Sequence, residues 1–143
     1  MTAWAGWLRH RLGEMKPERL CTLDEGADRF LADSLPSIPR QRLDSATAPC
    51  TLALGVNALD HLDAALAGHL IHRVRLFAAP RLLLVAQADC ALDDAAFRAL
   101  GFIREMADSG TGVRIQSYDL ATYKPTPDWL NARYWAHPGR WEP

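Results

Sequence analysis

Two short apolar runs, residues 50–56 (CTLALGV) and residues 81–86 (RLLLVA), constrain the possible folds of this chain most strongly. Each run is nearly continuous rather than alternating, which is typical of a strand that is buried on both faces of a parallel sheet. Between them, apolar residues recur at helical spacing over residues 59–77. A strand, a helix and a second strand in this order predict a right-handed parallel crossover and therefore an α/β fold.

The N-terminal segment predicts a helix over residues 3–15, with Thr2 as its N-cap and Pro17 beyond its end. Its apolar residues recur on one side of the helix, as in a helix that covers a larger apolar surface. We therefore expect residues 1–17 to dock on one face of the sheet.

Two further strands and a short helix are predicted between this segment and the first apolar run. Residues 19–23 and 40–44 have strand character, and residues 27–35 suit a helix that ends before a proline. Residues 24–26 (DEG) predict the turn that joins the first of these strands to the helix.

The second half of the chain predicts a helix over residues 92–100, which Gly101 ends. Residues 102–107 and 113–120 then predict an antiparallel hairpin around a glycine-rich loop. The alternative is that the helix continues through residue 107, because Arg, Glu, Met and Ala favour a helix. Gly101 is a good helix stop and favours the hairpin.

We expect a single α/β domain over residues 1–143, with a sheet core over 19–123 and a C-terminal tail over 124–143. The last 26 residues are rich in aromatic side chains, namely Tyr118, Tyr123, Trp129, Tyr134, Trp135 and Trp141. Such side chains most often pin a tail onto a sheet. The alternative is a partner interface, with a second copy or another protein, because Trp, Tyr and Arg recur as interface anchors.

Bulk properties exclude several classes of protein. The formal net charge is −1, so the basic excess of a general nucleic-acid binder is missing. Cys21, Cys50 and Cys90 form no CxxC pair, which predicts free thiols in a reducing cytosol rather than a zinc site. No run approaches the roughly 18 apolar residues of a membrane span, and no signal-peptide core is visible. We therefore expect a cytoplasmic protein that binds neither membranes nor nucleic acid.

The centre of the chain resembles the Rossmann-like (class I) S-adenosylmethionine-dependent methyltransferases. The matching letters are LALGVNALDHLD, HLIHRVRLFAAP and RLLLVA, followed by AFRALGF and SYDLATYK, within residues 51–123. This resemblance implies a three-layer fold with a mostly parallel sheet and a C-terminal antiparallel hairpin. Because the segment before residue 51 is short, it implies a shortened methyltransferase-like sheet of five or six strands.

The resemblance also implies candidate residues for the cofactor. Methyltransferases place an acid and then GxGxG after their first strand, so that the backbone can approach the ligand. Here Asp24 and Gly26 match that pattern, whereas Ala27 and Asp28 stand where a second glycine is expected. Asp44 could match the acid that binds the ribose hydroxyls, and the alternative is that it only starts a loop.

Asn57, Asp60 and His61 are the candidates for catalysis or substrate binding. Asn57 follows the apolar strand, at the edge where open parallel sheets bind ligands. Asp60, His61 and Asp63 could form a proton-accepting cluster at the start of a helix. The alternative for each of these polar residues is helix capping or a favourable interaction with the helix dipole.

No metal site is predicted. His61, His69 and His72 share one side of a helical wheel, but His61 and His72 would lie about 16 Å apart along a helix. The pair that remains has no third ligand. The sequence also contains neither the GxSxG pattern of a hydrolase nor a Walker loop.

Two functions are consistent with these observations. The first is a non-catalytic, methyltransferase-like binding or interaction module, with no cofactor, and the missing glycines favour it. The alternative is an active S-adenosylmethionine-dependent methyltransferase that acts on a small molecule.

Overall fold

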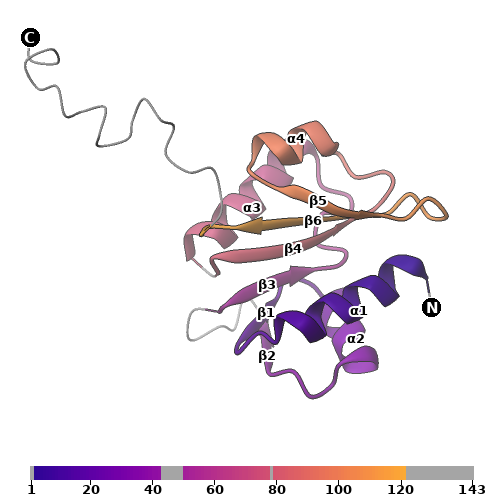
Figure 1. The fold of residues 1–143 in the computed structure, drawn as a ribbon. Coiled ribbons are helices and arrows are strands. Elements are labelled where there is room, and N and C mark those ends of the chain that lie inside the picture. The colour runs from indigo at the N-terminus through magenta and orange to yellow at the C-terminus, as the bar shows by residue number, and fades with distance from the viewer. Residues whose placement is uncertain (1, 43–49, 78, 122–143) are drawn as a thin grey trace, which may run out of the picture.

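The computed structural model describes residues 2–42, 50–77 and 79–121. These residues form a six-stranded sheet with the order β2-β1-β3-β4-β6-β5 (Figure 1). The strands are β1 Leu20–Thr22, β2 Arg40–Arg42, β3 Leu52–Gly55, β4 Arg81–Ala86, β5 Ile103–Ala107 and β6 Arg114–Asp119. Asp44 and the short helix predicted after residue 126 lie outside the described residues.

Most neighbouring strands in the sheet are parallel. Strand β1 pairs in parallel with β2 and β3, and β3 pairs in parallel with β4 through partners such as Ala53 and Leu82. Strand β6 is antiparallel to both β4 and β5, and a bulge interrupts β5 between Arg104 and Met106. The predicted α/β class, the parallel crossover and the C-terminal antiparallel hairpin are therefore confirmed, consistent with a shortened Rossmann-like methyltransferase topology.

Helices cover both faces of the sheet and make three layers (Figure 1). The helices are α1 Ala3–Met15, α2 Glu25–Ser34, α3 Ala64–Phe77 and α4 Asp94–Ala99. Helices α1 and α2 contribute Leu8 and Leu31 to a core with Leu83. Helices α3 and α4 pack on the other face, where Ile71 and Phe97 belong to a separate core. Alternate residues of β3 and β4 point to opposite cores, which explains why both strands read as continuous apolar runs.

Helix α1 has the predicted bounds, and two side chains accept hydrogen bonds from backbone N–H groups of its first turn. The Thr2 hydroxyl accepts a hydrogen bond from the backbone N–H of Ala5. The Asp108 carboxylate, in the loop between β5 and β6, accepts a hydrogen bond from the backbone N–H of Trp4 at 3.2 Å. This second contact ties α1 to the hairpin end of the sheet.

Two predicted helix starts were wrong. Helix α2 begins at Glu25, because Asp24 acts as its N-cap instead of belonging to a turn over residues 24–26. Helix α3 begins at Ala64 rather than at residue 59, because the Asp63 carboxylate accepts a hydrogen bond from the N–H of Leu66 at 2.8 Å. In both cases a short acidic side chain satisfies N–H groups that no helical carbonyl can reach.

The segment before α3 consists of turns, and His61 has a left-handed backbone with φ of 64°. The helical wheel that placed His61 beside His69 and His72 was therefore wrong, since only the latter two belong to α3. The predicted hairpin after Gly101 was right, because this glycine has φ of 94° and stops α4. Among the described residues, no helix has both the length and the apolar character that a membrane span requires.

Candidate functional site at the carboxyl edge of the sheet

The order of the strands identifies one edge of the sheet as the place for a ligand. Strands β1 and β3 are parallel neighbours, but α2 after β1 and α3 after β3 pack on opposite faces. The chain thus diverges beyond the carboxyl ends of these two strands, and open α/β sheets bind ligands in such a crevice. Asp24 follows β1 at this edge, and Asn57 follows β3.

The Asp24 carboxylate joins its own segment, at the start of α2, to the segment that follows β3. Its Oδ2 atom accepts hydrogen bonds from the N–H groups of Asn57 at 2.7 Å and Gly26 at 3.1 Å. Its Oδ1 atom accepts one from the N–H of Val56 at 3.0 Å. The carboxylate therefore caps α2 and holds the end of β3 against the end of β1. A negative charge is also favourable at a helix N-terminus.

Gly26 lies in the first turn of α2, directly beneath Asn57. A Cβ atom on Gly26 would stand 2.6 Å from Asn57 Nδ2 and 2.9 Å from Asp24 Oδ2. Glycine is therefore required here because the chain's own side chains approach the backbone closely. In the methyltransferase pattern, glycine at this place lets a ligand approach instead.

A polar cluster that the sequence did not reveal lies between α2 and β2. The buried Thr22 hydroxyl donates to Asp28 Oδ1 at 2.7 Å, and Arg42 donates to Asp28 Oδ2 at 2.8 Å. Burial alone would raise the pKa of Asp28, but the hydrogen bonds from Arg42 and Thr22 and the charges of Arg42 and Arg40 lower it. The negative charge of Asp28 is therefore compensated by Arg42, which the tertiary structure brings to it from β2.

Asp60 and His61 lie in the turns that follow β3. Burial raises the pKa of Asp60, and so do the negative charges of Asp89 and Asp24, whereas His61 opposes this shift. These carboxylates therefore share the carboxyl edge of the sheet. His61 is exposed, as are His69 and His72 on α3. In the part of the chain that the structure describes, no three His, Cys, Asp or Glu side chains are arranged to hold a metal ion.

These contacts do not fit a methyltransferase cofactor site. The acid after β1 is bound to three N–H groups of its own chain, and Asn57 covers the single glycine. At the position of a further glycine, Asp28 forms an ion pair with Arg42. The residues that the family pattern assigns to a ligand are thus engaged in contacts between β1, α2, β2 and β3.

Comparisons with known proteins give a family but no activity. No curated protein matches this chain. The crystal structure of an rRNA methylase from Escherichia coli is similar over 71% of this chain and 56% of that chain, with 14% sequence identity and a TM-score of 0.39. This chain therefore spans little more than half the length of that methylase. A family model described as a family of unknown function (DUF6231) matches residues 4–143, and the chain belongs to this family.

Proposed function

We propose that this chain is a non-catalytic binding module with a methyltransferase-like fold. At the edge where a methyltransferase would bind its cofactor, the side chains of this protein bind to other parts of the same chain. The observation that carries this proposal is the Asp24 carboxylate, which accepts hydrogen bonds from the N–H groups of Gly26, Val56 and Asn57. A carboxylate has about four acceptor positions, so little capacity remains for a ligand.

A ligand at this edge would have to displace contacts that stabilise the fold. Moving Asp24 would expose the N-terminus of α2 and would leave the N–H groups of Val56 and Asn57 without an acceptor. Val56 is buried, and a buried N–H group that loses its hydrogen bond costs about 1–3 kcal/mol. The binding energy of a cofactor would first have to offset this cost.

The alternative function is an S-adenosylmethionine-dependent methyltransferase that acts on a small molecule. The observation that favours it is Asp60, because a carboxyl group with a raised pKa beside His61 is a typical proton acceptor in active sites. In this alternative, Asn57, Asp60 and His61 would face the substrate. Burial and neighbouring acidic side chains account for the raised pKa of Asp60 without catalysis, so this observation is the weaker of the two.

Calorimetric titration of the full chain with S-adenosylmethionine and S-adenosylhomocysteine separates the two functions. We expect no binding tighter than about 1 mM. The variant Asn57→Gly removes the side chain that covers Gly26, and we expect it to bind no better because Asp24 stays engaged. Micromolar binding by the natural chain, weakened by Asp44→Ala, would establish the alternative instead.

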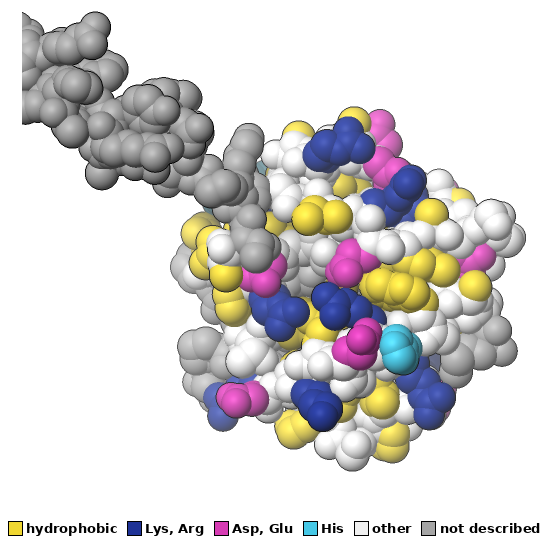
Figure 2. Space-filling view, viewed as in Figure 1, with side chains coloured by type: hydrophobic (Ala, Val, Ile, Leu, Met, Phe, Trp, Pro, Cys, Tyr) yellow, Lys and Arg dark blue, Asp and Glu magenta, His cyan; other side chains and the backbone are white. Residues whose placement is uncertain are grey.

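The ligand of this module, on our proposal, is a protein segment rather than a small molecule. Away from the carboxyl edge, the face that carries α1 shows apolar side chains surrounded by basic and acidic ones (Figure 2). Ile103 on β5 is 67% exposed, although it belongs to a strand. Apolar surface with a polar rim is typical of a site where a polypeptide segment, of the same chain or of another, binds.

A further inference from the structure

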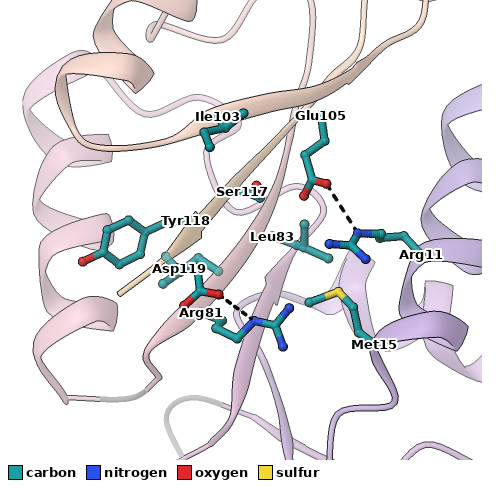
Figure 3. A pocket seen from close by; sticks show the side chains of 10 residues that line it. Arg11, Met15, Arg81, Leu83, Ile103, Glu105, Ser117, Tyr118 and Asp119 are labelled. Atoms are coloured by element: carbon teal, nitrogen blue, oxygen red, sulfur yellow. Dashed lines mark ion pairs between the residues drawn. The ribbon is translucent and has the colours of Figure 1, made fainter. Parts of the chain in front are cut away.

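A cavity of about 290 Å³ lies between the C-terminal half of α1 and strands β4, β5 and β6 (Figure 3). Helix α1 contributes Arg11 and Met15 to its wall. The sheet contributes a row of paired residues, Leu83, Ser117 and Ile103, from three adjacent strands. This cavity is separate from the carboxyl edge, so its occupancy does not depend on whether a cofactor binds at that edge.

The apolar part of this cavity is incompletely covered. Leu83 is fully buried, whereas Ile103, which flanks Ser117 on the same face of the sheet, is 67% exposed. An apolar occupant of the cavity would cover the Ile103 side chain and remove its surface from water, which is favourable.

The charges around the cavity are balanced. Arg11 pairs with Glu105 at 3.4 Å, and Arg81 pairs with Asp119 at 3.6 Å. Because each arginine is paired with a carboxylate, the cavity has no net positive charge that would favour an anionic ligand. The guanidinium groups can still lie against aromatic rings. The cavity therefore suits aromatic side chains with little net charge.

We propose that this cavity binds the chain's own C-terminal segment, residues 122–143. Strand β6 ends at Asp119, which lines the cavity, and the described residues end two positions later, at residue 121. Its 22 residues hold five of the chain's twelve aromatic side chains, namely Tyr123, Trp129, Tyr134, Trp135 and Trp141. Three basic and two acidic residues give the segment a formal charge of only +1. The family model also extends over this segment, to residue 143.

The chain's own segment is a better occupant than a second copy. A short tether gives a bound segment an effective concentration in the millimolar range, far above that of a free protein in dilute solution. Closing a loop of a few residues costs little conformational entropy. Binding within one chain is therefore favoured at any ordinary protein concentration.

Paramagnetic relaxation in the full chain tests this assignment. Cys90→Ser removes the one thiol that is not buried, since Cys21 and Cys50 are buried, and Asn131→Cys then carries a nitroxide label. We expect the label to broaden the amide signals of Ile103 and Ser117, and dilution to leave this loss of signal unchanged. Amide signals of α4, on the other face of the sheet, serve as the internal reference.

Two matched variants complete the experiment. Ile103→Glu places a charge at the cavity and is expected to abolish the broadening, and Ile103→Ser is a milder second variant. Leu76→Glu alters a similarly exposed residue, 60% exposed on α3, and is expected to leave the broadening unchanged. The proposal is overturned if the amides of Ile103 and Ser117 are not broadened. It is also overturned if folded Ile103 variants still show the broadening. The same holds if, in a mixed sample, labelled chains broaden the amide signals of unlabelled chains.

Discussion

The side chain of Asn57 lies against the backbone of Gly26, so that a Cβ on Gly26 would stand 2.6 Å from Asn57 Nδ2. The first residue follows β3, and the second lies at the start of α2 after β1. Their contact joins the two segments where the chain diverges to opposite faces of the sheet. The edge at which this fold type binds ligands is therefore a structural junction in this protein, and its strength can be measured.

The first prediction concerns Gly26→Ala. The added methyl group would also stand 2.9 Å from Asp24 Oδ2, and three hydrogen bonds prevent that carboxylate from moving. We expect a net loss of about 1–2 kcal/mol in the free energy of unfolding, because overpacking outweighs the better helix propensity of alanine. Urea denaturation followed by circular dichroism measures this change. An unchanged or raised stability would show that the Asp24 side chain can move away from the added methyl group at little cost.

Gly68→Ala is the same substitution in another helix, and it is expected to raise the stability instead of lowering it. Gly68 lies inside α3, and among the described residues no atom beyond its chain neighbours and its own helix backbone would come within 4 Å of a Cβ placed there. Without a steric penalty, alanine should raise the free energy of unfolding by about 0.5–1 kcal/mol. The same denaturation experiment measures it, and a loss of stability at this position would contradict the helical conformation of α3.

Asp24→Ala should cost more than the loss of an ordinary helix cap. Asp93 caps α4 through a single bond to the N–H of Ala96 at 2.8 Å, so Asp93→Ala should cost about 1 kcal/mol. Asp24→Ala removes the acceptor of three N–H groups, and we expect a loss of about 2–4 kcal/mol. Comparing the denaturation midpoints of the two variants tests this difference. Equal losses would mean that the bonds to Val56 and Asn57 contribute nothing.

The stability of the protein should fall in acid partly because of Asp94. Burial raises the pKa of Asp94, but hydrogen bonds from Arg114 and Gln116 and the charges of Arg114 and Arg104 lower it below its ordinary value of 3.8. A carboxyl group with a lowered pKa in the folded state stabilises the protein above the pKa of the unfolded state. That stabilisation is lost as the pH falls through the folded-state pKa.

Asp94→Asn should therefore flatten the dependence of stability on pH below about pH 4. The measurement is the free energy of unfolding of both proteins between neutral pH and strong acid. Asp33→Asn changes an exposed carboxylate on α2 and controls for the loss of one negative charge. If Asp94→Asn and the natural chain keep parallel pH profiles, the ion pairs of Asp94 do not stabilise the folded state.

Local patterns predicted the sheet elements better than the helix starts. The runs that form β3 and β4 are apolar on both faces, so hydrophobic periodicity identifies these strands. A helix-stopping glycine separates α4 from β5 and marks the boundary between them. The starts of α2 and α3 depend on which of several nearby acids becomes the N-cap. Asp24 and Asp63 have that role only because of the hydrogen bonds that they make in the folded chain.

The sequence by itself determined the α/β class, the parallel crossover and the hairpin, since hydrophobic periodicity and glycine positions are local properties of a chain. It also showed that the glycine pattern for a cofactor is incomplete. Only the tertiary structure decided what the polar residues after the strands do. Asp24 meets Asn57, and Asp28 meets Arg42, because parallel strands bring the ends of distant segments together. Hydrogen bonds act over about 3 Å, so a contact of this kind depends on distances in space that spacing along the chain does not encode.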